Sequence, residues 1–348
     1  MKRSGFSRGL AALAVLAIFA GACSATPAAS GGANGKYTIG FSNAGGVGNG
    51  WREAMLCSAK AQAVKAGNVS KVSIIHHDTD AAGQLADIRT LIAQGVNAII
   101  INPSGPDALN PAIAEAIAKN ITVIAVDASV TAPGAYNLSN DQQQYAYLGA
   151  SWLFKAMGDK GAVVYMRGIA GHPADTDRDT GFQKALKEHP GITIASTTVT
   201  KWDPATATQQ INDVMSAGTK FDGIWTSGVD SNIVDALKAA NHPYVPIVGA
   251  DNNGFLKQLM STKGLRGAVV TNPATIGGVG AAMAIKLLQG KSVPKWVKLT
   301  PQVWDNGTAK GKADIKANYS PSRPPTYSAR LQVKPWTTYS TKQLFACK

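Results

Sequence analysis

Eight residues of types that bind hydroxylated small molecules lie in the loops of this chain, nearly all just after an expected strand. They are Trp51, Arg52, Asn102, Asp127, Arg178, Trp202, Asp251 and Asn272. Carboxylate and amide groups pair with neighbouring hydroxyls, arginine adds charge-assisted donors in a fixed fork, and an indole covers the apolar face of a ring or chain. The set is typical of a site for a neutral polyhydroxylated ligand.

Each of these residues also has a structural interpretation. Trp51 could fill a core, Arg178 could be a solvated charge at a helix start, and Asn102 could be a turn residue. Asp127 and Asp251 end two similar apolar runs, VIAVD and IVGAD, and each could cap the turn that follows. Ligands of open α/β sheets bind at the carboxyl ends of strands, so eight such residues together favour a shared site.

The motifs that would indicate a nucleotide, a metal or a nucleophile are absent from the sequence. In the segment GGVGNGWR the third glycine of G-x-G-x-x-G falls on Trp51 or Glu53, and no GxxxxGK[ST], HExxH, CxxC or GxSxG occurs. His76 and His77 are adjacent, so in a strand they point to opposite faces and cannot easily share one metal. We therefore expect no catalytic residues, no metal and no cofactor.

One enzyme hypothesis remains open at this point. The loop GHPADTD contains His172, Asp175 and Asp177, which could serve a hydrolase as acid and base groups. The structural alternative, which we favour, is a polar loop that caps a helix.

Short apolar runs alternate with amphipathic stretches along the chain, a rhythm that predicts an α/β protein with mainly parallel sheets. The expected strands cover residues 37–42, 72–76, 98–101, 121–127, 162–166, 192–199, 223–226, 245–251 and 268–270. The expected helices cover residues 51–66, 81–94, 107–119, 180–188, 206–217, 232–240 and 255–260. Because the rhythm restarts near residue 162, we expect two similar lobes, followed beyond Trp304 by a tail that is mostly loop.

Composition is that of a globular protein with a basic surface. The 348 residues are 45% hydrophobic and 16% charged, with a formal net charge of +13. Lysine and arginine are scattered, with no block of five or six, so a nucleic-acid partner is not expected. A basic surface suits a position beside an anionic membrane.

The N-terminus has the features of an export signal. Lys2, Arg3 and Arg8 precede an apolar run over residues 10–20, which is too short to span a bilayer. The small residues before Cys23 resemble a bacterial lipobox, which predicts a diacylated Cys23; ordinary signal cleavage is the alternative. Residues 24–35 lack the apolar residues needed to fold and are expected to form a flexible tether.

Two further cysteines, Cys57 and Cys347, form an even pair in a protein expected to be exported. Such a pair is a candidate disulfide that would tie the C-terminal tail to an early helix. The alternative is two unpaired thiols, with Cys57 on a buried helix face.

Five segments together resemble type I periplasmic sugar-binding proteins of the ribose- and galactofuranose-binding kind, over residues 36–304. They are YTIGFSNAG with GNGWR, GVNAIIINPSGPDAL, ITVIAVDASV, RGIAGHPADTDRDTGF and IVGADNNG. The resemblance implies two lobes, each a parallel sheet flanked by helices, joined by a three-strand hinge. It implies a non-enzymatic, monomeric protein that delivers a sugar or polyol to the permease of an ABC transporter. With a lipidated Cys23 it would lie on the outer face of the cell membrane, and otherwise it would be free in the periplasm.

The resemblance divides the chain and assigns ligand contacts. The expected parts are a signal peptide (1–23), a tether (24–35), a first lobe (36–139 with 273–297), a second lobe (140–272 with 298–320) and a tail (321–348). Carried over by position, the ligand-binding residues are Trp51, Arg52, Asn102, Asp127, Asn140, Arg178, Trp202, Asp230, Asp251 and Asn272.

Two departures from the ribose-binding pattern leave the ligand open. Ala128 follows Asp127 where ribose binders have arginine, and Gly228 with Asp230 nearby replaces an asparagine. Furanoses, pentoses, hexoses and linear polyols stay as candidates. Another small polar ligand, such as a signalling furanone or a nucleoside, is the alternative.

Overall fold

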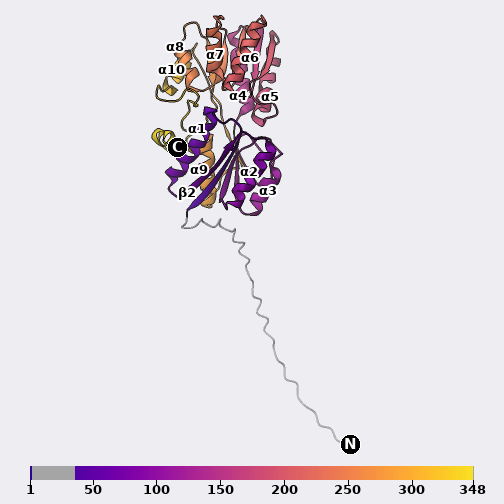
Figure 1. The fold of residues 1–348 in the computed structure, drawn as a ribbon, viewed down its shortest axis with the longest axis vertical. Coiled ribbons are helices and arrows are strands. Elements are labelled where there is room, and N and C mark those ends of the chain that lie inside the picture. The colour runs from indigo at the N-terminus through magenta and orange to yellow at the C-terminus, as the bar shows by residue number, and fades with distance from the viewer. Residues whose placement is uncertain (2–35, 348) are drawn as a thin grey trace.

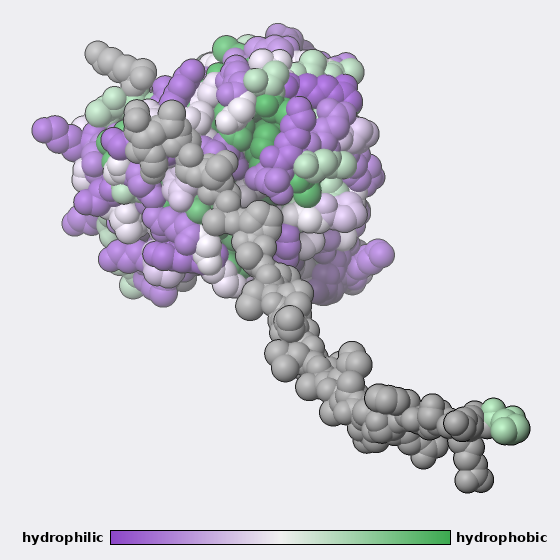
Figure 2. Space-filling model, turned by 90° about the horizontal axis from the view of Figure 1, so that it is seen from below, coloured by the Kyte–Doolittle hydropathy of each residue, from purple (hydrophilic) through white to green (hydrophobic). Residues whose placement is uncertain are grey.

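The computed structural model describes Met1 and residues 36–347, so the expected signal peptide, the tether and Cys23 lie outside the described residues. The described chain forms two lobes stacked along the long axis, each a sheet covered by helices on both faces (Figure 1). This confirms the expected α/β architecture of two similar lobes. The face seen in Figure 2 is mostly hydrophilic, with apolar atoms exposed between the hydrophilic residues.

The first lobe is built on a six-stranded parallel sheet in the order β11-β5-β4-β3-β1-β2. Its strands are β1 (Tyr37–Ala44), β2 (Val69–His77), β3 (Ala98–Asn102), β4 (Thr122–Asp127), β5 (Tyr136–Asn140) and β11 (Trp296–Leu299). Helices α1 (Gly50–Ala66) and α9 (Ile276–Leu288) pack on one face, and α2 (Ala81–Ala93) and α3 (Asn110–Ala118) pack on the other. The central strand β3, AIIIN, is buried along its whole length, as expected for a parallel strand covered on both faces.

The second lobe repeats this plan with the order β12-β10-β9-β8-β6-β7, in which only the edge strand β12 is antiparallel. Its strands are β6 (Gly161–Arg167), β7 (Ile192–Val199), β8 (Gly223–Trp225), β9 (Ile247–Ala250), β10 (Gly267–Val270) and β12 (Val303–Asp305). Its helices are α4 (Gln142–Ala156) and α5 (Pro173–Glu188) on one face, and α6 (Pro204–Ser216), α7 (Asp230–Ala239), α8 (Asn253–Ser261) and α10 (Ala309–Asn318) on the other. The last helix, α11 (Thr341–Phe345), packs on α1 of the first lobe.

The helices begin where side chains cap them. Asn49, Asp80, Asp141 and Asp203 each accept a hydrogen bond from a backbone N–H of the first turn of α1, α2, α4 and α6. Such caps satisfy donors that have no partner inside the helix and typically contribute about 1 kcal/mol each. Asn49 and Asp141 also fix the entry of two helices at the boundary between the lobes.

Several elements differ from the sequence-based expectation. The expectation omitted α4 and α9, started α5 at residue 180 instead of Pro173, and treated residues 309–318, now α10, as loop. Helix α9, IGGVGAAMAIKLL, is buried on nearly every side and therefore lacks an amphipathic period. A Cβ on Gly277 would overlap the Met55 carbonyl, so glycine is what permits α9 to approach α1 this closely.

Between Tyr37 and Asp305 the chain passes from one lobe to the other three times. The crossings are β5 to α4, β10 to α9 and β11 to β12. Strand β11 pairs with β5 as far as Leu299, so the third crossing begins two residues beyond the lobe boundary drawn at residue 297. Among the residues described, no helix has both the length and the apolar character to cross a bilayer.

Candidate ligand-binding site

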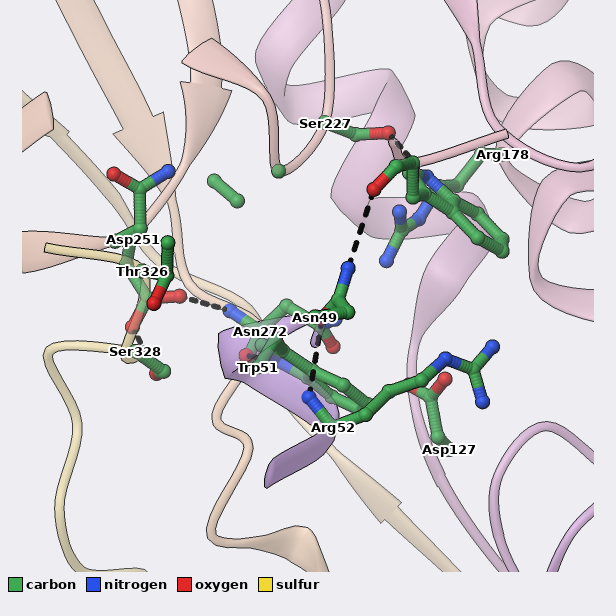
Figure 3. A pocket seen from close by; sticks show the side chains of 14 residues that line it. Asn49, Trp51, Arg52, Asp127, Arg178, Ser227, Asp251, Asn272, Thr326 and Ser328 are labelled. Atoms are coloured by element: carbon green, nitrogen blue, oxygen red, sulfur yellow. Dashed lines mark hydrogen bonds between the residues drawn. The ribbon is translucent and has the colours of Figure 1, made fainter. Parts of the chain in front are cut away.

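A cavity lies between the lobes (Figure 3). Loops of both lobes and the C-terminal segment line it. The lining residues are Asn49, Trp51, Arg52, Asp127, Arg178, Trp202, Ser227, Gly228, Ala250, Asp251, Asn252, Asn272, Thr326 and Ser328. Seven of the ten residues expected from the sequence are therefore brought together here.

The loop from β1 to α1 positions the first-lobe side of the cavity. Gly46 has a φ of 71°, and a Cβ at this position would overlap the Arg52 side chain, so the glycine leaves room for the arginine. The Arg52 guanidinium is buried and donates to Asn43 Oδ1 (2.8 Å) and to the Ala44 carbonyl (3.2 Å). The glycine cluster of this loop thus holds an arginine in place.

Two cavity residues have a left-handed backbone. Asp127, at the end of β4, has a φ of 68°, and Trp202 has a φ of 54°. This region is uncommon for residues other than glycine and costs on the order of 1–3 kcal/mol, a strain often found at binding sites. Gly168 has no Cβ where the Trp202 indole packs, which makes room for the indole.

The second-lobe side combines an arginine with aromatic rings. The Arg178 guanidinium lies 4.4 Å from the Tyr145 ring centroid and 5.6 Å from that of Trp202. These distances are in the range of cation–π attraction. Trp202 Nε1 donates to Ser227 Oγ (3.2 Å), which orients the indole.

Gln142, the first residue of α4, connects both sides and was not expected from the sequence. Its Nε2 donates to Asp127 Oδ1 (2.9 Å) and to Asn272 Oδ1 (3.3 Å). Its Oε1 accepts from Arg178 Nε (2.9 Å). One hinge amide thus joins an acid of the first lobe to an arginine of the second. The only sequence signal was its place two residues after Asn140, in the crossing.

The lobes also touch directly across the cleft. Asn49 Nδ2 donates to the Trp202 carbonyl (3.2 Å), and Trp51 Nε1 donates to the Asn272 carbonyl (2.7 Å). Figure 3 shows the Asn49 amide pointing from the end of α1 toward the second lobe. The structure is therefore a closed arrangement of the two lobes.

The charges of the cavity balance. Burial raises the pKa of Asp127, and the charges of Arg178 and Arg52 partly offset this. Burial likewise raises the pKa of Asp251, which hydrogen bonds from Asn272 and Ser328 counteract. Two arginines and two aspartates in one buried space suit a ligand with no net charge.

Three of the expected site residues lie outside this cavity. Asn102 is under α1, with its Nδ2 3.9 Å from Met55 Sδ, and Asn140 donates to the Thr271 carbonyl (3.2 Å), fastening two crossings together. Asp230 is fully buried beneath the Gly228 loop, where it accepts from Gly228 N (3.1 Å) and from the Asn252 amide. Asn102 and Asn140 end strands as expected, and Asp230 begins α7, but none of the three is part of the cavity wall.

The residues of the hydrolase hypothesis are engaged in loop structure. His172 Nδ1 accepts from Ala174 N as the cap of α5, and burial lowers the pKa of His172 to about 3, which keeps it neutral. Asp175 accepts from Gly168 N (2.8 Å) and Arg167 (2.7 Å), while Asp177 accepts from Gln143. None of the three lines the cavity. Within the described ranges, no group of three metal-binding side chains comes together.

Two α/β lobes that close over a charge-balanced cavity at a three-stranded hinge define a two-lobed solute-binding protein. The chain belongs to the periplasmic binding protein domain family, whose sequence model matches residues 39–292. This confirms the resemblance seen in the sequence.

Similar proteins are binding components of transport systems. The chain is 28% identical over 220 residues to a xylitol-binding protein of Mycolicibacterium smegmatis, covering 62% of this chain and 63% of that protein, which is less than two thirds of its length. It is 25% identical over 226 residues to a ribose import binding protein of Haemophilus influenzae, covering 64% and 77%. An ABC transporter solute-binding protein from Mycobacterium smegmatis with bound glycerol superposes with a TM-score of 0.74 at 25% identity, covering 85% of this chain and all of that one.

Proposed function

We propose that this protein binds a monosaccharide or polyol in the cavity between its lobes and delivers it to the permease of an ABC importer. One observation carries the proposal: each lobe contributes one arginine, one aspartate and one tryptophan to the same cavity. Arg52, Asp127 and Trp51 come from the first lobe, and Arg178, Asp251 and Trp202 from the second. A ligand with hydroxyls on both sides would engage both sets at once.

Binding of this kind favours closure of the hinge. A ligand stabilises the closed state only by the contacts that it makes better there than in the open state, and a cavity divided between the lobes supplies such contacts. An analogue that lacks one hydroxyl would leave a buried acid or arginine without a partner, which costs about 1–3 kcal/mol. Selectivity among sugars follows from this penalty.

The known proteins that resemble this chain support the ligand class. They include proteins named for xylitol, ribose and D-apiose, and a structure with bound α- and β-L-arabinofuranose. All four of these compounds are small, neutral and polyhydroxylated, as the balanced charge of the cavity requires. Another small polar ligand, such as a furanone or nucleoside, is the second candidate, because paired acids and arginines would also bind its hydroxyls.

The role is one of binding without catalysis, in an exported and monomeric protein that binds no nucleic acid. A diacylated Cys23 would hold it on the outer face of the membrane, and a free periplasmic form is the alternative. Metabolic labelling with palmitate should mark the wild type and leave Cys23→Ser unlabelled. An unlabelled wild type would exclude the anchor and leave the binding function untouched.

A ligand panel tests the function. Purified residues 36–348 would be screened with pentoses, hexoses, furanoses and linear polyols by thermal shift and by intrinsic fluorescence. A ligand at 100 times its dissociation constant adds about 2.7 kcal/mol to stability. Trp51 and Trp202 at the cavity should report the same event. A panel without any shift or fluorescence change would refute the sugar-binding proposal, and nucleosides would then test the second candidate.

A further inference from the structure

Residues 320–347 form a segment that the three-crossing hinge does not include. The segment leaves the second lobe after α10 and ends on the first lobe at α11, beside α1 (Figure 1). We call it the C-terminal strap. It is a fourth connection between the lobes, and it is attached to both of them.

Backbone and amide hydrogen bonds hold the first part of the strap on the second lobe. Asn253 Nδ2 donates to the Ser320 and Arg323 carbonyls (2.9 and 3.0 Å). The backbone N–H groups of Asn253 and Gly254 donate to Tyr327 and Pro325, and Ala329 N donates to the Asp251 carbonyl (2.6 Å). These bonds fix the strap against the N-terminus of α8, next to the cavity.

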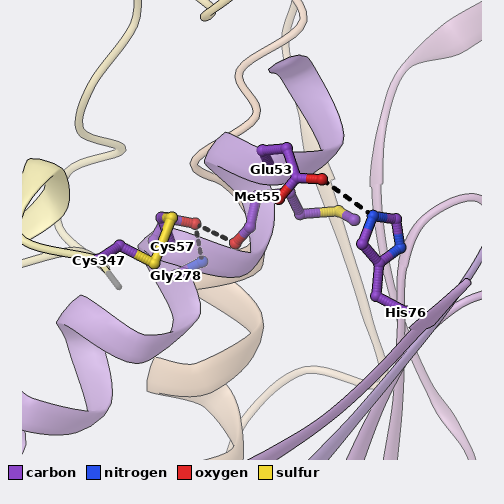
Figure 4. The surroundings of a disulfide bond; sticks show 7 residues. Glu53, Met55, Cys57, His76, Gly278 and Cys347 are labelled. Carbon is purple, nitrogen blue, oxygen red and sulfur yellow. Dashed lines mark hydrogen bonds and ion pairs between the residues drawn. A yellow bond between two sulfur atoms is a disulfide. The ribbon is translucent and has the colours of Figure 1, made fainter. Parts of the chain in front are cut away.

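A disulfide and a small apolar cluster hold the last part on the first lobe. Cys57 of α1 is bonded to Cys347 (Figure 4). Tyr339 and Leu344 are buried in the same apolar cluster as Cys57. The Gln62 side chain of α1 exchanges two hydrogen bonds with Thr338, at 2.9 and 3.2 Å. The attachment at this end is therefore covalent.

Within the part that is attached to the second lobe, the strap also lines the ligand cavity. Ser328 Oγ donates to Asp251 Oδ2 (2.9 Å), so a cavity carboxylate of the second lobe is held by the strap. Thr326 lies against the first residue of α1, where a Cβ on Gly50 would overlap its side chain. Both residues are part of the cavity wall in Figure 3.

We propose that the strap is a fourth hinge strand whose residues 326–328 form one wall of the ligand site, held in place by the Cys57–Cys347 bond. The bond closes the strap across the boundary between the lobes, so separation of the lobes must stretch or release the strap. It therefore limits opening on the α1 side of the cleft and raises the affinity for ligand by ordering the wall in advance. This inference rests on the proposed ligand site.

The double variant Cys57→Ala/Cys347→Ala removes the covalent attachment and leaves no free thiol at this site. Amide hydrogen exchange of residues 325–331 should become about tenfold faster or more, because this part of the strap would open without unfolding of the lobes. Titration with xylitol and with D-ribose by calorimetry should show a dissociation constant raised about fivefold or more.

Two further variants separate the strap from general destabilisation. Ile113→Val, in a core cluster of the first lobe that contains no strap residue, should lower thermal stability and leave both readouts at their wild-type values. Ser328→Ala keeps the disulfide and should weaken binding without faster exchange at α11. Wild-type exchange at residues 325–331 in the double variant would overturn the proposal, as would a wild-type dissociation constant. If neither xylitol nor D-ribose binds the wild type, the proposed function fails for these ligands. The exchange measurement alone then decides whether the Cys57–Cys347 bond holds residues 326–328 in place.

Discussion

The two sides of the cavity contain the same three residue types but hold them differently. The first-lobe acid, Asp127, is oriented by the hinge through the Gln142 amide. The second-lobe acid, Asp251, accepts from the backbone of Asn272 (2.8 Å) and of Arg330 (3.4 Å) and from the hydroxyl of Ser328. Asp251 thus binds both the second crossing and the C-terminal strap. Asp127 is the acid that can more readily exchange its hydrogen bonds for bonds to a ligand.

The two arginines are also held differently, but here the first-lobe residue is the one that its own lobe fixes. Arg52 is fixed by two acceptors of its own lobe, Asn43 and Ala44. Arg178 is held by aromatic rings of the second lobe and by Gln142, the same residue that orients Asp127. Ligand recognition therefore centres on the linked set of Arg178, Gln142 and Asp127, which spans the hinge.

Arg178→Ala should have the largest effect on binding. It removes the cation bound to Gln142 and one of the two cations beside the buried Asp127, whose pKa is raised. Such a loss typically costs 2–5 kcal/mol, which corresponds to about 30-fold to several thousand-fold in affinity. Calorimetric titration with the ligand found in the panel measures this. Arg178→Lys should not restore affinity, because an ammonium lacks the planar fork that stacks between rings. Near wild-type affinity in Arg178→Ala would show that the linked set is not the centre of recognition.

Asp127→Asn and Asp251→Asn should separate binding from stability. We expect Asp127→Asn to weaken ligand binding by about 2 kcal/mol with little change in melting temperature, since the side chain loses charge-assisted bonds to the ligand and the attraction of the two arginine charges. Asp251→Asn should instead lower the melting temperature of the ligand-free protein, because its amide would oppose donors of the strap. Equal affinity losses and equal melting temperatures in the two variants would contradict the division of roles.

Asp230 provides a pH test of the scaffold role assigned to the second-lobe acids. Burial raises its pKa to about 6, above the unfolded value of about 3.9, so the folded state binds more protons between these values. The stabilisation from protonated Asp230 is present below about pH 4 and is lost as the pH rises through 6, about 3 kcal/mol in all. Denaturant unfolding of the wild type and of Asp230→Asn should be measured from pH 4 to 7. As the pH rises, the free energy of unfolding of the wild type should fall relative to that of the variant. A constant difference across this range would rule out the raised pKa.

The sequence was sufficient for the architecture and for most of the cavity, for a physical reason. Asp127 and Asp251 follow buried apolar strands, and parallel strands bring their carboxyl ends to one edge, so local pattern determines where these side chains lie. Gln142 and Ser328 could not be found in this way. Their roles depend on contacts with Arg178 and Asp251 at large sequence separations, and no periodicity marks such contacts. Asp230 was assigned to the cavity by its position in the family resemblance, whereas at the start of α7 it is buried beneath the Gly228 loop.

The two tryptophans give the comparison with the smallest expected change in affinity. Trp51 Nε1 donates to the Asn272 carbonyl (2.7 Å), a backbone group of the second crossing, whereas Trp202 Nε1 donates to the Ser227 hydroxyl (3.2 Å) within its own lobe. In Trp51→Phe the carbonyl loses its donor, at about 1 kcal/mol, and because this bond joins α1 to the hinge, affinity should fall about fivefold. In Trp202→Phe the hydroxyl can rotate to another partner, so the loss should be about twofold. Calorimetric titration of both variants measures the affinities without relying on tryptophan fluorescence. A larger loss of affinity in Trp202→Phe would mean that the bond from Trp51 to the hinge does not couple the Trp51 indole to closure of the lobes.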